Sequence, residues 1–312
     1  MRTDPRQMLS GMSYPVLIAA AIGAPLTMMG SGLSVFASTC IPAVAAALAV
    51  SLLELCNPER TDWKPARKDV FNDTLFMAIV QLVVPKAVGF LILIAVARSL
   101  PESGLDMLRV WPSHWPVPAQ FLLMVLLADF FRYWLHRGAH GIPWLWAFHA
   151  VHHAPRVLYW WNVGRFHPVD KGLQICLDSV PFILVGVTEP VLAVYFVFYA
   201  TNGFLQHSNI HLWHGPLNYV FSTAELHRWH HARDGRVAHC NFGNNLIVWD
   251  LLFGTWYLPK GRQVQIIGIR DESYPVDFLG LMKAPFYRLA ESHSPSNPVD
   301  VPIHDRSRES TQ

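Results

Sequence analysis

The sequence has few charged residues and few cysteines. Only 15% of its 312 residues are Asp, Glu, Lys or Arg, and 52% are hydrophobic, whereas soluble domains average roughly 25% charged residues. The net charge of +2 supplies no basic stripe to neutralise phosphates, which argues against nucleic acid as a partner. The four cysteines form no CxxC pair, so the sequence predicts neither a secreted disulfide framework nor a cysteine-ligated iron–sulfur cluster.

Motifs of several other enzyme classes are also missing. No dinucleotide-binding glycine fingerprint follows a predicted strand, and no haem site is evident. The zinc-protease motif HExxH is absent, because the nearest match, HRGAH, has Arg137 where the general base would be. The Glu-x-x-His motif of carboxylate-bridged di-iron bundles is absent too.

Long hydrophobic runs are plentiful. A membrane helix needs about 20 residues, so the first run fits a two-helix hairpin with a break at residues 30–32, and the last run fits a second hairpin that turns near Thr188. Each arm of the last run is short, so a shallow or re-entrant hairpin is an alternative to two full crossings. The runs cover residues 14–55, 75–96, 119–135 and 173–205.

The distribution of basic residues predicts the topology. Residues 57–69 contain Arg60, Lys64, Arg67 and Lys68, and loops rich in Lys and Arg stay in the cytoplasm. Counting crossings from there puts the histidine-rich segments on the cytoplasmic face. We therefore expect an all-α, multi-pass membrane bundle of about four to six membrane helices with a cytoplasmic, histidine-rich helical cap.

Three regions follow from this pattern. Residues 1–118 form N-terminal membrane helices and loops, and residues 119–260 form a histidine-box catalytic region with a membrane hairpin. Residues 261–312 form a C-terminal cytoplasmic segment. Its tail, from about Ser292, is rich in Ser, Pro and charge and is expected to be disordered.

The most informative feature is a repeated histidine pattern. An HxxxH pair followed by an HxxHH cluster occurs twice, with the last hydrophobic run between the two units. Residues three and four apart share a helix face, so each unit would present five imidazoles to one side and the two units together would enclose a dinuclear site. The ten histidines are His136, His140, His149, His152, His153, His207, His211, His227, His230 and His231.

Imidazole ligation leaves several metals open. All-nitrogen sites suit Zn, Cu, Fe or Ni. Ten ligands exceed what one tetrahedral zinc uses, which favours two ions of higher coordination number and hence iron. A structural zinc domain stays an alternative, as does a metal-handling membrane protein such as a transporter. A transporter would place ligands within the apolar segments, but these histidines fall at segment ends.

The order of these boxes resembles the fatty acid hydroxylase / sterol desaturase superfamily of membrane di-iron enzymes. The resemblance covers residues 126–258 and includes the accompanying segments Arg-Phe-His-Pro at 165–168, Gln-His-Ser-Asn at 206–209, Asn-Phe-Gly at 241–243 and Trp-Asp-Leu-Leu-Phe-Gly-Thr at 249–255. Residues 1–100 match only in being membrane-spanning.

The resemblance implies an O2-dependent monooxygenase that hydroxylates an unactivated C–H bond of a membrane lipid such as a sterol or fatty acyl chain. Desaturation at the same site is the alternative. It further implies two Fe ions held by the ten box histidines, with O2 as co-substrate. It also implies an external electron donor of the ferredoxin or cytochrome b5 type with its reductase. The sequence leaves both a bacterial inner membrane and the endoplasmic reticulum open as the location. His167 and His239 would be extra ligands or groups that support ligands.

Three carboxylates lie close to the boxes in sequence. Asp129 stands two helix turns before His136 and would either orient a ligand imidazole or pair with Arg132. Glu225 and Asp250 flank the last box and would either support a ligand in the same way or lie on the surface.

Overall fold

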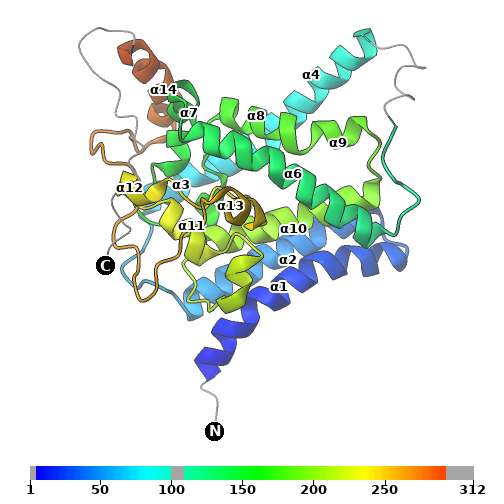
Figure 1. The fold of residues 1–312 in the computed structure, drawn as a ribbon, viewed down its shortest axis with the longest axis horizontal. Helices are drawn as coiled ribbons and strands as arrows, with labels where there is room; N and C mark the ends of the chain where they lie inside the picture. Colours follow the sequence, from blue (N-terminus) through cyan, green and yellow to red (C-terminus); the bar gives the residue numbers. More distant parts are fainter. Residues whose placement is uncertain (1–4, 100–108, 293–312) are drawn as a thin grey trace.

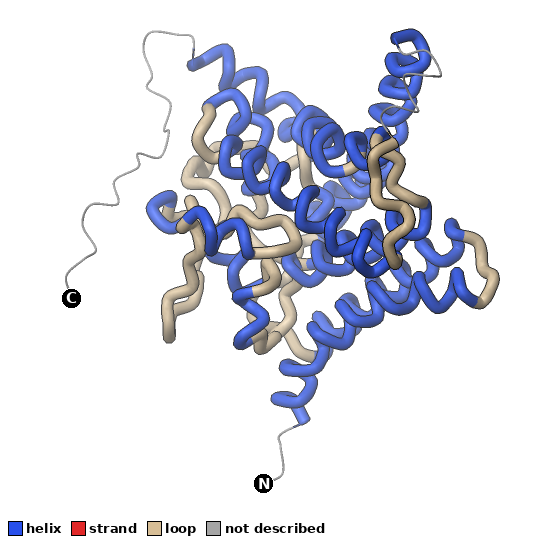
Figure 2. Tube along the Cα trace, turned by 45° about the vertical axis from the view of Figure 1, so that its right-hand side comes forward, coloured by secondary structure: helices blue, strands red, loops and turns tan. Residues whose placement is uncertain are grey.

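The described part of the chain, residues 5–99 and 109–292 of this computed structural model, is 68% helical and has no β-strand (Figure 2). Three isolated bridges join loops. The predicted all-α fold is confirmed. The tail that the sequence predicts to be disordered lies outside the described residues.

The first hydrophobic run is a hairpin of two long helices. Helix α1 (Pro5–Gly30) and helix α2 (Val35–Cys56) lie side by side (Figure 1). Gly32 takes a positive φ of 87° in the turn between them, a conformation that glycine adopts without steric cost. Ser34 then caps α2 by accepting a hydrogen bond from the Ala37 N–H at 3.2 Å. The predicted break at residues 30–32 is confirmed.

Two further helices are long and apolar enough to cross a membrane. The first is continuous from α3 (Arg67–Leu75) through a π-helical stretch, η1 (Phe76–Val83), into α4 (Val84–Ser99). The second is α6 (Val117–Ala139). With α1 and α2 they give four candidate spans in the described residues, at the lower end of the predicted four to six.

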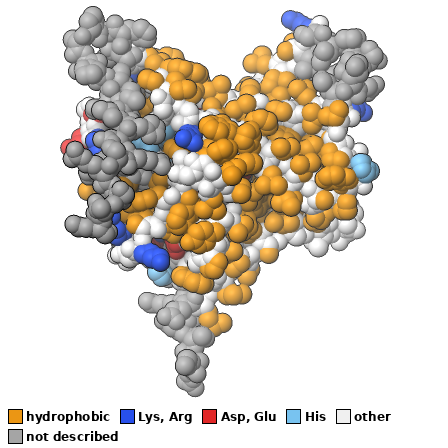
Figure 3. All heavy atoms as spheres, viewed as in Figure 1, with side chains coloured by type: hydrophobic (Ala, Val, Ile, Leu, Met, Phe, Trp, Pro, Cys, Tyr) orange, Lys and Arg blue, Asp and Glu red, His pale blue; other side chains and the backbone are white. Residues whose placement is uncertain are grey.

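These helices expose large apolar side chains. Phe36, Leu55 and Phe90 are 77%, 80% and 62% exposed, and hydrophobic side chains gather over the middle and right of the face drawn in Figure 3. Exposed apolar patches on this scale mark a contact surface for lipid or protein. On helices of membrane-spanning length, lipid is the solvent that makes the exposure favourable.

The last hydrophobic run forms a broken arm and a buried arm. Helix α8 (Pro168–Asp178) stops at Ser179 and a short helix, α9 (Val180–Leu184), follows. Thr188 precedes α10 (Glu189–His207), so the predicted turn near Thr188 is confirmed. Helix α10 is not among the four candidate spans of the described residues. It packs against α1, α2 and α6 and forms the centre of the bundle.

The histidine-rich cap lies at one end of the bundle, where α1 begins and where α2 and α6 end (Figure 1). Short helices joined by long loops build it. They are α7 (Pro143–His153), η2 (Trp160–Gly164), η3 (Gly215–Tyr219), α11 (Ala224–His230), α12 (Gly235–Ala238), α13 (Val248–Phe253) and α14 (Phe278–Ser292).

Asp129 joins this cap to the bundle. Its carboxylate is fully buried on α6 and accepts hydrogen bonds from the Asn245 backbone at 2.9 Å, the Asn245 side chain at 2.8 Å and the Leu246 backbone. The hypotheses that it orients an imidazole or pairs with Arg132 are both wrong, because the loop before α13 uses its oxygens. Arg132 instead faces Asp178, at 3.5 Å.

We predict that Asp129→Ala will destabilise the protein by on the order of 3 kcal/mol, because it leaves three buried N–H donors without an acceptor. Thermal unfolding of the purified protein in detergent measures the effect. Asp62→Ala is the control, since that carboxylate is 64% exposed and its loss should leave the unfolding temperature unchanged. Equal unfolding temperatures for the two variants would contradict the proposed link.

Candidate metal centre

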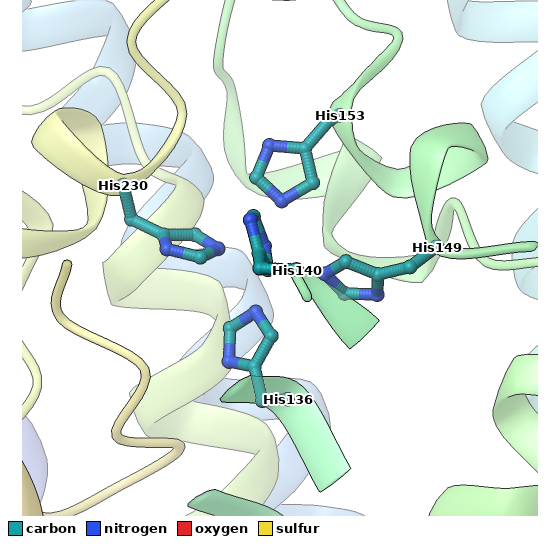
Figure 4. A group of neighbouring side chains, drawn as sticks. All are labelled: His136, His140, His149, His153 and His230. Carbon is teal, nitrogen blue, oxygen red and sulfur yellow. The ribbon is translucent and has the colours of Figure 1, made fainter. Parts of the chain in front are cut away.

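Nine of the ten box histidines gather into two groups. The ligand nitrogens within each group all lie within 4.8 Å of one another. Figure 4 shows the five-histidine group, whose rings converge from several elements. That group contains His136, His140, His149, His153 and His230, and the four-histidine group contains His152, His207, His227 and His231.

Each group contains one histidine from the other sequence unit. The five-histidine group includes His230 of the second unit, and the four-histidine group includes His152 of the first. On α7, His149 and His153 are four residues apart and share the five-histidine group, while His152 points to the other. At α11 the arrangement is mirrored, because His227 and His231 share the four-histidine group and His230 joins the five-histidine group. Residues four apart share a helix face and adjacent residues do not. An HxxHH cluster therefore serves both groups, and neither group forms without the other unit.

His211 lies outside both groups. Helix α10 ends at His207 and Ser208 is extended, so His207 and His211 do not share a helix face as the HxxxH spacing predicts. The His211 side chain is 59% exposed and its Nδ1 is 2.6 Å from Glu59. The expectation of ten converging histidines is therefore wrong at this position.

Fixed acceptors hold the outer nitrogen of five of these rings. Carbonyl and carboxylate oxygens only accept hydrogen bonds, so each Nδ1 carries the proton and each Nε2 keeps a lone pair for a metal. The pairs are His136 with Phe242 O at 2.8 Å, His149 with Asp170 at 2.8 Å, His152 with Arg165 O at 3.3 Å, His207 with Asn162 at 2.9 Å, and His230 with Cys240 O at 2.8 Å.

The Nε2 atoms, which point into the groups, have no partner in the rest of the described protein. All five Nε2 atoms of the five-histidine group are buried without a hydrogen bond. Buried polar atoms are almost always paired, so five unpartnered nitrogens at one point fit a site for a cation. Imidazole nitrogens bind transition metals at about 2.0–2.1 Å, which puts two nitrogens on one ion about 3–4 Å apart, and the ligand nitrogens of this group all lie within 4.8 Å of one another.

The four-histidine group is equally suited to a cation. The Nε2 of His227 lies 3.0 Å from that of His207 and 3.1 Å from that of His231. Burial, strengthened by the charge that neighbouring imidazoles would carry, lowers the pKa of His227 and His231 well below the usual range. The rings are therefore neutral at physiological pH, which is the form that binds a metal.

The acceptors Asp170 and Asn162 were not predicted from the sequence. Asp170 stands in the first turn of α8 and is 21 residues from His149, and Asn162 lies in η2, 45 residues from His207. No spacing rule links such pairs. An acidic first-turn residue in the helix that follows a histidine box is the one signal that points to Asp170.

The predicted support from Asp250 acts through the backbone. Its two oxygens accept from the Phe242 and Gly243 N–H groups, both at 2.7 Å, and this holds the loop whose Phe242 carbonyl binds His136. A Cβ on Gly243 would lie 2.3 Å from the Leu246 carbonyl oxygen, so only glycine fits. The Asn-Phe-Gly segment therefore serves to place the Phe242 carbonyl against His136, and its glycine is required by the close approach to Leu246.

The other predicted positions lie outside both groups. His167 caps α8 by accepting from the Val169 N–H at 3.1 Å, and its other nitrogen is 3.3 Å from Met282 O. His239 lies beside the five-histidine group, its ring centroid 5.4 Å from that of His140. Glu225 accepts from Asn218 and faces His214, so it supports no ligand ring.

One cavity of about 200 Å³ reaches both groups. Rings from each group line it, among them His136 and His149 from one and His207 and His227 from the other. The remaining wall comes from η1, α6, η2, α8 and α10 and from the loop before α13, which includes Asn244. A molecule in this cavity would meet both groups of histidines at once.

Comparison with known proteins gives consistent results. The family model for fatty acid hydroxylase matches residues 121–255. An ornithine lipid hydroxylase of Rhizobium tropici is 34% identical over 241 residues, which are 77% of this chain and 72% of that protein. No solved structure matches significantly.

More distant relatives align with a smaller part of the chain. Human alkylglycerol monooxygenase is 28% identical over 58% of this chain and 39% of its own length. A probable Delta(7)-sterol 5(6)-desaturase of Neurospora crassa is 27% identical over 48% of this chain and 42% of its own length. The chain thus spans less than half of these two relatives.

We expect His207→Ala to lower the metal content of the purified protein from about two ions toward one per chain, because the four-histidine group would keep three ligands. His211→Ala should leave the content unchanged. Metal analysis by mass spectrometry, with circular dichroism to verify folding, measures both. An equal loss in the two variants would show that both members of this HxxxH pair bind metal.

Asp170→Asn should weaken metal binding by about 10–100-fold, since a neutral amide makes the His149 ring less basic and orients it less firmly. The rate of metal loss to a chelator measures this effect. Asp62→Asn, a change of the same kind on the surface, is the matched control. Identical rates would rule out a role for Asp170 in the metal site.

Proposed function

Because the chain belongs to the fatty acid hydroxylase family and is therefore a lipid-oxidising enzyme, we propose that it is an O2-dependent di-iron monooxygenase that hydroxylates a C–H bond of a membrane lipid. Its relatives are named as a lipid hydroxylase, monooxygenases and desaturases, which are oxidoreductases. This kinship removes the basis for a metal-transport function.

The observation that carries the proposal is the convergence of nine imidazoles into two buried groups beside one cavity. When bound there, iron would supply the redox chemistry that oxidation of an unactivated C–H bond requires and that zinc lacks. The chain's own part is to fix the rings through their Nδ1 hydrogen bonds, to exclude water and to place the lipid. We propose the nine histidines as the metal ligands.

The position of the cavity supports a lipid substrate. It lies where α6 and α10 enter the cap, and residues of the apolar helices, such as Met77 of η1 and Phe204 of α10, form part of its wall. A lipid tail can therefore stay among membrane helices while one end of the molecule reaches the histidines. Residues 119–260 would form the catalytic unit, and the earlier helices would complete its membrane wall.

The cytoplasmic orientation rests on a structural contact. The basic segment after α2 packs directly against the end of the second histidine unit, because the Glu59 N–H donates to Asn209 O and Pro58 bridges to Ile210. The cap and the segment with Arg60 and Lys64 thus share one face. The positive-inside rule assigns that face to the cytoplasm.

Electrons would come from a separate protein. The sequence has no dinucleotide fingerprint and no cysteine set for an iron–sulfur cluster. We therefore propose a donor of the ferredoxin or cytochrome b5 type with its reductase. Such a donor would reach the cap from the cytoplasm.

Comparative lipidomics tests this function. Membranes from cells that express the wild type should contain a lipid heavier by one oxygen, and labelled O2 should supply that atom. His152→Ala, which removes a ligand of the four-histidine group, should abolish the product. His211→Ala is the control that should retain it.

A lipid lighter by two hydrogens would instead favour desaturation, which the distant sterol desaturase relative also supports. Membranes with the same composition in wild type and His152→Ala, despite bound iron, would contradict lipid oxidation altogether. Zinc in place of iron after iron-replete expression would exclude the di-iron proposal.

A further inference from the structure

Arg132 is a buried cation on the wall of the cavity. It is 7% exposed and stands on α6 four residues before His136. Residues at this spacing share a helix face with Cβ atoms about 5–6 Å apart. The two residues therefore stand one helix turn apart on α6, and both line the cavity.

The hydrogen-bonding capacity of Arg132 is mostly unused. One Nη2 hydrogen bond goes to Asn244 Oδ1 at 3.2 Å. Asp178 lies 3.5 Å from Nη1, but Nε and Nη1 have no hydrogen-bond partner. A guanidinium has five N–H donors, and a buried cation near a membrane core is costly unless its donors are paired. The Nε and Nη1 donors of Arg132 are therefore available to an acceptor on a molecule in the cavity.

Two further unpaired atoms stand on the same wall. Gln174 Oε1 and Asn244 Nδ2 are buried without a partner, and both residues line the cavity. Gln174 Nε2 is already used, because it donates to Asp170 at 3.0 Å. The cavity therefore presents several donors together with one acceptor, a combination that an alkyl chain cannot satisfy.

We propose that Arg132, with Gln174 and Asn244, binds a neutral polar group of the lipid that both accepts and donates hydrogen bonds, namely a secondary amide or a hydroxyl. Its oxygen accepts from Arg132 and Asn244, and its N–H or O–H donates to Gln174. An anionic group fits less well, because Asp178 already faces the guanidinium and Asp170 also lines the cavity.

This assignment rests on the proposed function and narrows its substrate class. The cavity of about 200 Å³ is smaller than the ~300–1,000 Å³ of pockets that enclose a whole ligand, so it holds one end of a lipid. Because Arg132 and His136 line this same small cavity, the oxidised carbon lies within a few atoms of the polar group. The middle of a long acyl chain is thereby excluded as the site of reaction.

Equilibrium binding of defined amphiphiles tests the site without catalysis. The probes are N-dodecylacetamide, its N-methylated form, which lacks the N–H, and tetradecanol, each bound to the purified protein in lipid nanodiscs. Arg132→Met/Asp178→Asn removes both charges together, so that no carboxylate is left unpaired. Arg67→Met, at an exposed position on α3, is the matched control.

We expect the double variant to bind the secondary amide about tenfold more weakly than the wild type, in line with the loss of a hydrogen bond to a charged group. Gln174→Met should remove the preference for the secondary over the N-methylated amide. The Arg67→Met control should bind all three probes as the wild type does. The iron content of the Arg132→Met/Asp178→Asn variant should equal that of the wild type. Arg132-dependent binding of tetradecanol alone would assign the hydroxyl form of the proposal, whereas binding that is independent of Arg132 for all probes would overturn it.

The position of the added oxygen separates this inference from the function on which it rests. Tandem mass spectrometry of the wild-type product should place the oxygen in the fragment that carries the polar group. Oxygen in the remote acyl chain would refute the role of Arg132 while leaving lipid hydroxylation intact. Arg132-dependent probe binding without any oxidised lipid would support the site and contradict the proposed function.

Discussion

The hydrogen bond between a ring Nδ1–H and a fixed oxygen is the interaction on which the centre depends. It selects the tautomer that leaves Nε2 free, and it prevents the ring from turning away when nothing is bound. The acceptors differ in kind, from the Asp170 carboxylate and the Asn162 amide to the backbone carbonyl of Phe242. Each acceptor is itself held by the fold, so the geometry of the metal site is distributed over the whole cap.

This dependence explains why the bundle and the cap cannot be separated. The loop that supplies Phe242 O and Cys240 O to two rings is held by Asp250 from within the cap and by Asp129 from α6. The buried pair of Asp73 and Arg165, 2.6 Å apart, similarly joins α3 to the carbonyl that binds His152. The membrane helices therefore help to position rings on other elements, namely His152 of α7 and His230 of α11. Burial also lowers the pKa of rings such as His227 and His231, because the charged form would be poorly solvated.

The two groups of histidines are structurally coupled, because each HxxHH cluster supplies rings to both of them. Each HxxHH cluster sends its first and last rings to one group and its middle ring to the other. Rings of different groups stack, as His153 and His231 do at a centroid distance of 4.3 Å. Movement of α7 or α11 would thus disturb both groups together. The shared cavity gives a substrate access to both groups as well.

Periodicity and composition determined much of this protein. Hydrophobic runs predicted the α1–α2 hairpin and α6, and the i, i+4 spacing predicted that His149 and His153 share a helix face, because both properties are local. The prediction that His152 shares that face is wrong, because His152 joins the other group. The prediction for His211 was wrong, because α10 ends at His207 and the i, i+4 spacing places two residues on one face only within a helix. Asp170, Asn162 and the use of Asp129 depended on which segments meet in space, and Asp129 and Leu246, which meet there, are 117 residues apart. Only tertiary packing brings such atoms within hydrogen-bond distance, so only the folded structure revealed what holds the rings and what Arg132 faces.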